Sequence, residues 1–464
     1  METIKIDSLA YKGYGVGRIN SKVAFVGYAC PGDTLKIEIY DEHKNYAFGR
    51  IVEIINPSPK RITPVCKHFG VCGGCDYLHM PYEEELYWKT EVFKAEFNKT
   101  FKDFGFKDFE NVNLIKGFKT QNYLNYRQKI GLKIAPPLIG FYKKMSHDVC
   151  GVEYCHLAKE GVNELLKNVR EALCRGNYGD NFLNEISSVT LTDTGLKNIT
   201  FSLKNRISNR IQNYDSAFKD IIKKTGADNI FVEFKHKKRG KGGNDKEGKK
   251  IIKYSEGRTE NDENSRGRGI DNYFMLKGKK FAYDLPSFVQ INKEQNENII
   301  EKVTAYIKNL NENRGIYFNN ALDLFCGYGN ITLFLADYVK MITGVEVDPF
   351  SVKLGEKNLK LNAVKNIKFV MSNAGDFLEK AGKERINYDL IVLDPPRAGI
   401  KGLVPRVAGL NPSSVIYISC DSMTLLRDLK VFACMGYLIE QINLIDMFPR
   451  TYHMEHIAFL SKKQ

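Results

Sequence analysis

"ALDLFCGYGNITLFLA", residues 321–336, is the stretch that decides the fold of the C-terminal part of the chain. A short apolar run is followed by a glycine-containing turn and then by a helical pattern of apolar residues. Gly327 and Gly329 allow the backbone to approach a ligand closely at the carboxyl end of a strand. The stretch therefore predicts a strand, a ligand-binding turn and a helix.

The apolar runs after this stretch continue the same pattern. "MITGVEV", "YDLIVLD" and "VIYIS" alternate with helical segments, which predicts a mostly parallel, Rossmann-like sheet over residues 279–464. Glu346 ends the second strand, where a carboxylate can bind ribose hydroxyls, and the third strand runs into "LDPPRAG". Thr332 occupies the third position of a dinucleotide glycine motif. The pattern favours a class I S-adenosylmethionine methyltransferase over a dinucleotide enzyme or a generic α/β domain.

Two further residues carry candidate chemistry. Cys420 ends the strand "VIYIS" just before a helix that Ser422 or Thr424 could cap, and a helix N-terminus favours thiolate over thiol. Glu455 lies in the apolar run "HMEHIAFL", where desolvation raises a carboxyl pKa. A thiolate that adds to carbon 6 of a pyrimidine activates carbon 5 for methylation, and a base then removes the carbon-5 proton. The alternatives are a core cysteine and an edge-strand glutamate.

The N-terminal half differs in pattern and charge. Residues 1–58 show period-2 patterning with glycine turns, which predicts a small β-barrel, and residues 59–278 predict a mixed α+β domain. A charged, glycine-rich insertion at about 236–272 predicts a solvated loop, with an RNA-contacting loop as the alternative. The net charge of +14 favours a nucleic acid partner. Neither a signal peptide nor a membrane-spanning run is recognisable, so we expect a cytoplasmic location. We also expect a monomer.

The ten cysteines divide into clustered and isolated ones. "CKHFGVCGGC" contains Cys66, Cys72 and Cys75, and "SHDVCGVEYC" offers Cys150 or Cys155 as a fourth ligand. Clustered thiolates suit either zinc or an iron–sulfur cluster, and spacing alone does not separate the two. The isolated cysteines are expected to be buried and unreactive: Cys30, Cys174, Cys326 and Cys434.

Five motifs together resemble one family. "SFVQINKEQNENII", "LDLFCGYGN", "VLDPPRAG", "ISCDSMTLLRDL" and "DMFPRTYHMEHIAFL" are similar, in this order, to motifs of the bacterial RNA (uracil-5-)methyltransferases, especially those that act on 23S ribosomal RNA. The resemblance covers essentially the whole chain. It implies that Cys420 is the nucleophile and Glu455 the proton acceptor, and that the barrel is a TRAM RNA-binding module.

The resemblance also implies ligands for two cofactors. It implies that S-adenosylmethionine contacts Gln290, Phe325, Glu346 and Asp394, with Asn330 and Asn373 as further candidates. Asp394 is also a candidate contact of the target base, and Arg397 is implied as a substrate contact. A [4Fe–4S] cluster is implied on Cys66, Cys72, Cys75 and Cys155, with zinc as the alternative, and Cys150 is an extra thiol outside that pattern.

Other functions are distinguished by particular residues. A transfer-RNA uridine methyltransferase is the runner-up for the same chemistry. RNA cytosine-C5 enzymes typically carry a catalytic cysteine beside the D-P-P motif, and residues 389–400 contain none. Amine methylation needs no cysteine nucleophile. A non-catalytic RNA-binding or redox-sensing protein would be expected to have lost both the cofactor turn and Cys420.

Overall fold

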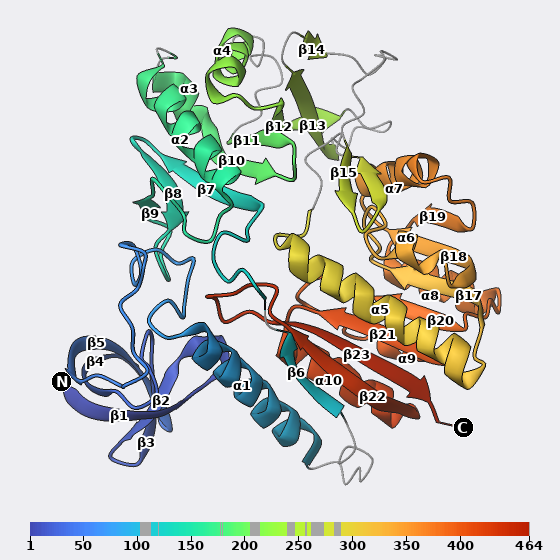
Figure 1. Ribbon diagram of the computed structural model, residues 1–464, viewed down its shortest axis with the longest axis horizontal. Coiled ribbons are helices and arrows are strands. Elements are labelled where there is room, and N and C mark those ends of the chain that lie inside the picture. Colours follow the sequence, from blue (N-terminus) through green and yellow to red (C-terminus); the bar gives the residue numbers. More distant parts are fainter. Residues whose placement is uncertain are drawn as a thin grey trace.

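The computed structural model describes most of the chain and shows three groups of elements (Figure 1). The described residues are 1–102, 113–118, 120–176, 178, 180–204, 214–238, 246–255, 258–260, 273–282 and 289–463. In Figure 1 a barrel lies at the lower left, a central sheet at the upper left, and a large sheet covered by helices on the right.

The N-terminal strands close into a barrel in the order β1-β2-β3-β5-β4. Alternate residues point inward, and Ile4, Ile6, Val26, Leu35 and Ile37 form its core. The predicted barrel is therefore confirmed. Its elements are β1 (Glu2–Leu9), η1 (Tyr11–Gly13), β2 (Gly15–Ile19), β3 (Lys22–Val26), β4 (Thr34–Glu42) and β5 (Tyr46–Asn56).

The central part is a sheet of eight strands in the order β14-β13-β12-β11-β10-β7-β8-β9. Helix α2 packs on it through apolar residues spaced three and four apart, including Val162, Leu165, Leu166 and Val169. The strands are β7 (Lys129–Ala135), β8 (Leu138–Tyr142), β9 (Val149–Gly151), β10 (Ile186–Asp193), β11 (Lys197–Leu203), β12 (Asn229–Lys238), β13 (Lys246–Ser255) and β14 (Arg258–Glu260), and the helices are α2 (Glu160–Arg175), α3 (Asp180–Glu185) and α4 (Asp215–Thr225).

Strand β13 corrects the prediction of a solvated loop at about 236–272. It pairs antiparallel with β12 along the whole of both strands and buries Ile252 and Tyr254. The short run "IIKY", residues 251–254, supplies enough alternating apolar surface for a strand despite its charged neighbours. The rest of the predicted insertion, apart from the strand ends and β14, lies outside the described residues.

The C-terminal part is a second sheet of eight strands in the order β19-β18-β17-β20-β21-β23-β22-β6. Strands β19 to β21 are parallel, and β23 runs antiparallel to both β21 and β22, so the mostly parallel sheet is confirmed. Its strands are β17 (Phe318–Leu324), β18 (Val339–Glu346), β19 (Ile367–Met371), β20 (Leu390–Leu393), β21 (Ser414–Ser419), β22 (Tyr437–Ile445) and β23 (Glu455–Lys462).

Both faces of this sheet are buried, because alternate strand residues enter two different cores. Ile416 and Ile418 face the core that contains α5, whereas Val415 and Tyr417 face the core that contains α10. A hairpin packs beside α7 on the α5 side. These elements are α5 (Lys293–Arg314), α6 (Thr332–Leu335), α7 (Pro349–Leu361), α8 (Ala374–Lys383), α9 (Val404–Gly409), α10 (Ser422–Cys434), β15 (Tyr273–Leu276) and β16 (Lys279–Ala282).

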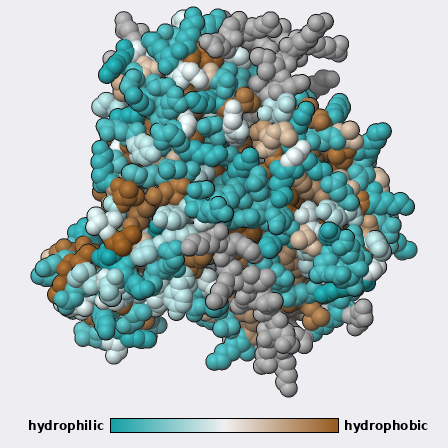
Figure 2. Space-filling view, viewed as in Figure 1, coloured by the Kyte–Doolittle hydropathy of each residue, from teal (hydrophilic) through white to brown (hydrophobic). Residues whose placement is uncertain are grey.

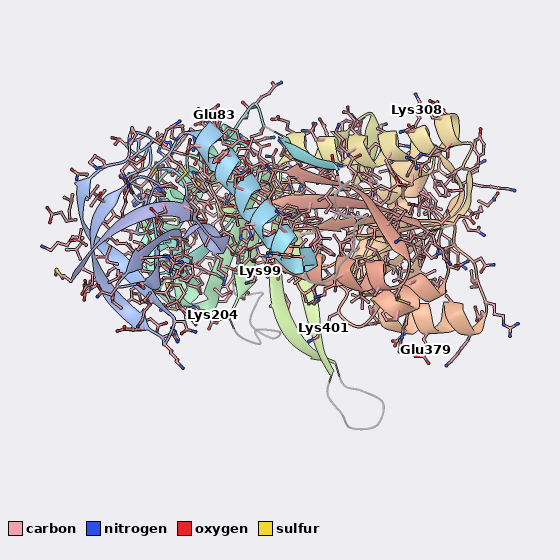
Figure 3. All side chains as sticks on the ribbon, turned by 90° about the horizontal axis from the view of Figure 1, so that it is seen from below. Glu83, Lys99, Lys204, Lys308, Glu379 and Lys401 are labelled. Atoms are coloured by element: carbon pink, nitrogen blue, oxygen red, sulfur yellow. The ribbon has the colours of Figure 1, made fainter. Side chains whose placement is uncertain are left out.

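Two elements from the middle of the chain belong to this C-terminal layer. Strand β6 (Asn113–Phe118) pairs parallel with β22 at the sheet edge. Helix α1 (Tyr82–Lys102) packs on the α10 side through Phe93, Phe97 and Phe101. Figure 3 shows α1, with Glu83 and Lys99 labelled, crossing between the barrel and the sheet. These pairings cross the predicted boundary at residue 279, and the division 1–58, 59–278 and 279–464 stays a prediction.

The isolated cysteines are not all buried. Cys30 and Cys326 are buried as expected, but Cys174 and Cys434 are exposed, at the C-terminal ends of α2 and α10. Both lie in the last turn of an amphipathic helix, on its outward side. Successive helix positions point in different directions, so a shift of one residue decides whether a side chain is buried or exposed. Within the described residues, no helix is both long and apolar enough to cross a bilayer.

Candidate active site

Strand pairing brings Cys420 and Glu455 to one end of the sheet. Strands β21 and β23 pair antiparallel with Ser419 opposite His456, and the same register places Cys420 opposite Glu455. Directly opposite residues of an antiparallel pair project from the same face. The His456 ring nitrogen Nδ1 lies 3.0 Å from the Ser419 carbonyl oxygen, which fastens this end of the pair. The two predicted catalytic residues are therefore neighbours although 35 residues separate them.

The helix after Cys420 begins differently from the prediction. Its cap is Asp421, whose carboxylate accepts a hydrogen bond of 2.9 Å from the Thr424 backbone N–H. Asp421 has the extended backbone that an N-cap requires, because it directly follows the strand. Ser422 instead donates its hydroxyl to Glu96 of α1 at 2.8 Å. The prediction that Ser422 or Thr424 caps the helix is wrong.

The half-buried thiol of Cys420 is not activated in the free protein. Burial and, next, the neighbouring Glu455 carboxyl raise its pKa to about 11, although the Arg397 guanidinium lowers it. The Asp421 carboxylate already uses the amide at the start of α10, and its negative charge offsets the helix dipole. The expectation that the helix start would favour the thiolate is therefore wrong for the protein without RNA.

Glu455 has the environment that the sequence predicts. It is buried with 6% of its surface exposed, and burial together with the Asp394 carboxyl raises its pKa well above the ordinary value. Asp394 follows β20, and desolvation raises its own pKa to about 7. Arg397 lowers the pKa of both Cys420 and Glu455, so its cation acts on both groups. Cys420, Glu455, Asp394 and Arg397 thus form one electrostatically linked set.

A cavity of about 470 Å³ lies beside this set, at the carboxyl ends of β17 and β18. Its volume is in the range of small-molecule sites. The cavity is lined by Phe325, Val345, Glu346, Val347, Ser372, Asn373, Ala374, Pro396, Ala398, Gly399, Ile400, Lys401, Leu403, Thr424 and Arg427. Three predicted cofactor contacts, Phe325, Glu346 and Asn373, therefore lie on its wall.

The turn above this cavity is rigid. Phe325, Gly327 and Gly329 all have positive φ, at 64°, 55° and 88°. A Cβ on Gly329 would lie 2.6 Å from Leu333 Cδ1 and 2.9 Å from Phe369 Cζ, so this position excludes a side chain. The Glu346 carboxylate accepts hydrogen bonds from the backbone N–H groups of Gly327, Val347 and Asp348 at 3.1, 2.7 and 2.9 Å. The carboxylate is thereby held in one orientation.

Three of the predicted cofactor contacts have hydrogen-bond partners within the protein. Asn330 exchanges two amide hydrogen bonds with Asn296, at 2.8 and 3.0 Å. The Asn373 side chain caps α8 through the Gly375 N–H at 2.8 Å. The Gln290 carbonyl accepts from Gln128 at 2.7 Å. Neither Asn330 nor Gln290 lines the cavity, and Asp394 lies with the thiol rather than on the cavity wall.

The turn before Glu455, residues 446–454 and called the return turn below, is anchored by buried charges of α1. Lys89 Nζ lies 2.8 Å from both Asp446 Oδ1 and Glu85 Oε1. The Arg450 backbone N–H donates to Glu85 at 2.7 Å, and its guanidinium contacts Glu85 at 3.3 Å. Arg450 has a φ of 69°, a conformation that a non-glycine residue holds only when its surroundings fix it.

The return turn is also bonded to the cysteine-containing segment. The Arg450 carbonyl accepts from the backbone N–H groups of Asp76 and Tyr77 at 2.8 and 3.2 Å. The Asp76 carboxylate accepts from the Tyr452 N–H at 3.1 Å and pairs with Lys144 at 2.9 Å. Asp76 directly follows Cys75, so the cysteine-rich segment and the strand that carries Glu455 are fastened to each other.

The predicted cysteine ligands share one cavity. Cys66, Cys72, Cys75 and Cys155 line a cavity of about 40 Å³, together with the side chain of Arg127 and the apolar side chains of Phe69, Leu78, Phe141 and Val152. Cys150 is buried outside that lining, with its sulfur 3.7 Å from His68 Nδ1. Within the part of the chain that the structure describes, no three His, Cys, Asp or Glu side chains converge as a metal ion requires.

Sequence reasoning missed several residues that support the site. Asp76, Lys89 and Tyr11 each bond to a segment hundreds of residues away, and no local pattern marks such a contact. The spacing of Glu85 and Lys89 predicts a helical ion pair, but ordinary pairs of this kind lie in solvent. The Tyr11 hydroxyl donates to the Asp421 carboxylate at 2.6 Å, so the barrel contacts the start of α10.

The raised pKa of Cys420 predicts a strongly pH-dependent thiol reactivity. In the free protein the rate of Cys420 alkylation by iodoacetamide should rise about tenfold per pH unit above neutrality and level off near pH 11. Arg397→Gln removes the cation that lowers this pKa, so the midpoint should move to higher pH. Peptide mapping by mass spectrometry follows this one thiol. A plateau below pH 8 would show that the free protein holds a thiolate.

Comparison with known proteins agrees with this geometry. Residues 266–463 match the family model described as tRNA (Uracil-5-)-methyltransferase, and residues 2–52 match the TRAM domain. An uncharacterized RNA methyltransferase of Aquifex aeolicus is 29% identical over 99% of this chain and 98% of that protein. The 23S rRNA (uracil(1939)-C(5))-methyltransferase RlmD of Aliivibrio fischeri is 26% identical over 99% of this chain and 96% of that protein.

A solved structure shares the fold. The tRNA (uracil-54, C5)-methyltransferase of Pyrococcus abyssi, in complex with S-adenosyl-L-homocysteine, aligns with a TM-score of 0.64 and 20% identity, over 98% of this chain and 100% of that one. The class I methyltransferase fold and the TRAM barrel are thus confirmed. Residues 266–463 are thus similar to the RNA (uracil-5-)methyltransferases, and the N-terminal barrel is similar to the TRAM domain.

Proposed function

We propose that the protein methylates carbon 5 of a uridine in 23S ribosomal RNA through a covalent adduct with Cys420. The observation that carries this proposal is the register of β21 and β23, which sets a thiol opposite a buried carboxyl group. Amine methylation requires neither group. The pair lies beside a cavity with the volume of a small-molecule site, so a methyl donor and a base could be held together.

Each residue has a definite role in this mechanism. The Cys420 thiolate adds to carbon 6 of the uracil, and the resulting enolate makes carbon 5 nucleophilic. S-adenosylmethionine, when bound, supplies the electrophilic methyl group that carbon 5 attacks. The Glu455 carboxylate then takes the carbon-5 proton, and the carbon–sulfur bond breaks to release the thiolate. Arg397, which favours the ionised form of both groups, stabilises the charges that they carry during the reaction.

The residues of the cavity fit an adenosylated cofactor. The Glu346 carboxylate is fixed by three backbone amides at the end of β18, where ribose hydroxyls bind in open α/β sheets. Phe325 lies on the cavity wall, with its backbone in the left-handed region at a φ of 64°. We propose Phe325, Glu346 and Asn373 as direct contacts. Asp394 is then assigned to the base, Asn330 is held by Asn296, and Gln290 stays a candidate contact of the cofactor.

The pairing of Cys420 with Glu455 predicts an adduct that one substitution should trap. Glu455→Gln keeps the size of the side chain but cannot accept the carbon-5 proton, so a protein–RNA adduct should accumulate on denaturing gels. Cys420→Ala should form no adduct and no 5-methyluridine, while S-adenosylhomocysteine binding persists in both variants. Free turnover by Glu455→Gln without an adduct would remove Glu455 from the proposed role.

The choice of RNA is supported by relatives. RlmD proteins of two Aliivibrio fischeri strains and of Vibrio parahaemolyticus, which are named for 23S rRNA, align over 99% of this chain. The description of the matching family model keeps a transfer-RNA uridine as the runner-up. Mass spectrometry of RNA from a deletion strain should show loss of 5-methyluridine from 23S rRNA and its retention in transfer RNA. The reverse pattern would assign the enzyme to transfer RNA.

We also propose that Cys66, Cys72, Cys75 and Cys155 hold a [4Fe–4S] cluster. Four thiols and apolar walls suit such a group, and the adjacent Arg127 offsets its negative charge. A single zinc ion would draw four sulfurs to about 2.3 Å from one point. The four thiols that line this cavity fit either group by their chemistry, so the metal content of the protein decides between a cluster and zinc. A cytoplasmic location and a monomeric state remain predictions from the sequence.

Two neighbouring cysteines allow a matched test of this assignment. Cys155→Ser should lower bound iron and the visible absorbance of anaerobically purified protein, because it removes one of the four ligands. Cys150→Ser should change neither, because Cys150 lies outside the cavity lining. Zinc in stoichiometric amount without iron would contradict the cluster. Loss of iron only in Cys150→Ser would make Cys150, and not Cys155, the fourth ligand.

A further inference from the structure

The barrel carries a cluster of aromatic rings on its outer face, called the ring platform below. Phe25 of β3 and Phe48 of β5 are register partners, with ring centroids 5.4 Å apart. Their chain neighbours Ala24, Val26, Ala47 and Gly49 are buried in the barrel, so both rings point outward. Ring contacts of 4.4 to 6.4 Å join the full set: Tyr14, Phe25, Tyr40, His43, Tyr46 and Phe48.

The ring platform is open to solvent. Tyr40 and Tyr46 are 46% and 37% exposed, and Phe25 and Phe48 are half-buried. Among the described residues, the ring neighbours of Phe25 and Phe48 are other members of the platform and not a covering helix or loop. The surface in Figure 2 is mostly hydrophilic, with apolar areas over the barrel and the segment above it. Exposed rings grouped in this way favour a ligand that has flat apolar faces.

The net charge of the barrel is too small to attract a polyanion. Residues 1–58 contain seven Lys or Arg and seven Asp or Glu residues, although the whole chain has a net charge of +14. Two of the basic side chains near the platform are paired, Lys22 with Glu42 at 2.6 Å and Arg50 with Glu38 at 2.7 Å. Any RNA held here is therefore held chiefly through its bases, and the phosphate-neutralising charge lies elsewhere in the chain.

The ring platform is continuous with the candidate active site. Lys144 Nζ lies 5.9 Å from the Tyr14 ring and 4.3 Å from the Tyr28 ring, and it pairs with Asp76. Asp76 holds the Tyr452 N–H, and the Tyr452 ring packs edge-on against Tyr11 at 6.0 Å. Tyr11 bonds Asp421, the neighbour of Cys420. An RNA strand that extends from Cys420 along these contacts would reach Tyr14, the first ring of the platform.

We propose that the ring platform stacks unpaired bases of the RNA segment that flanks the target uridine. The inference rests on the proposed function, because attack on carbon 6 requires a uridine that is outside a base stack. In a duplex the faces of the bases are covered by their neighbours, whereas an unpaired strand exposes them to aromatic side chains. Stacking tolerates any base, so the platform selects single-stranded structure and leaves the choice of nucleotide to the thiol site.

Binding measurements on the full chain test this role without any methyl transfer. The probe is fluorescent oligo(A), which contains no uridine, and its comparison is a blunt RNA duplex of equal length. The variant Phe25→Leu/Tyr46→Leu/Phe48→Leu keeps apolar volume but removes three ring faces. We expect its oligo(A) affinity to fall at least tenfold, with duplex affinity within twofold and the slope of log affinity against log salt unchanged. Tyr317→Leu, at a ring exposed by 71% before β17, is the matched control.

The outcomes separate stacking from other uses of this face. Unchanged oligo(A) binding, or an equal loss for oligo(A) and duplex with a shallower salt slope, would overturn the proposal. A change of oligomeric state in gel filtration with RNA binding intact would make the platform a contact between copies and would also overturn it. S-adenosylhomocysteine binding reports that the variant is folded. One outcome separates the two proposals: the wild type makes no 5-methyluridine, but the triple variant still has a lower affinity for oligo(A). The proposed function would then be wrong, and the stacking role of the platform would be upheld.

Discussion

The buried ion pairs between α1 and the return turn are the interaction on which the candidate site depends. Lys89 lies between the carboxylates of Glu85 and Asp446, and these two partners raise its pKa against the effect of burial. Removing one partner of such a buried set leaves an uncompensated charge, which typically costs about 3–5 kcal/mol. The return turn leads directly into β23, so the position of Glu455 opposite Cys420 follows from how α1 holds this turn.

The free protein holds its reactive groups in uncharged forms. With a pKa raised to about 11, the Cys420 thiol is protonated at neutral pH. The raised pKa of Glu455 likewise favours its protonated form. A buried thiol that stays protonated is protected from stray alkylation and oxidation, since the thiolate is the reactive species. The proposed attack by Cys420 therefore requires this pKa to fall when RNA binds, and Arg397 is a cation that already lowers it.

The sequence predicts the sheet and the buried environment of Glu455 well, because both depend on local signals. Alternating apolar runs define β17 to β21, and an acidic residue within an apolar strand marks Glu455. The errors occur in two situations. In one, the interacting residue lies far away in the sequence; in the other, a shift of one residue in where an element ends or how it is rotated changes the result. The choice of Asp421 as cap depends on where β21 stops, and the exposure of Cys174 and Cys434 depends on the rotation of each helix. No local pattern shows that Asp76 binds Tyr452 or that Tyr11 binds Asp421.

Strand β6 ties the middle of the chain to the catalytic sheet. It pairs with β22, more than 300 residues later in the sequence, and covers what would otherwise be the open edge of that sheet. An uncovered edge offers unpaired N–H and C=O groups to other molecules and promotes aggregation. During synthesis the ribosome therefore releases β6 long before its partner exists. The C-terminal half expressed by itself would also lack this protection, and β22 would then be an open edge strand.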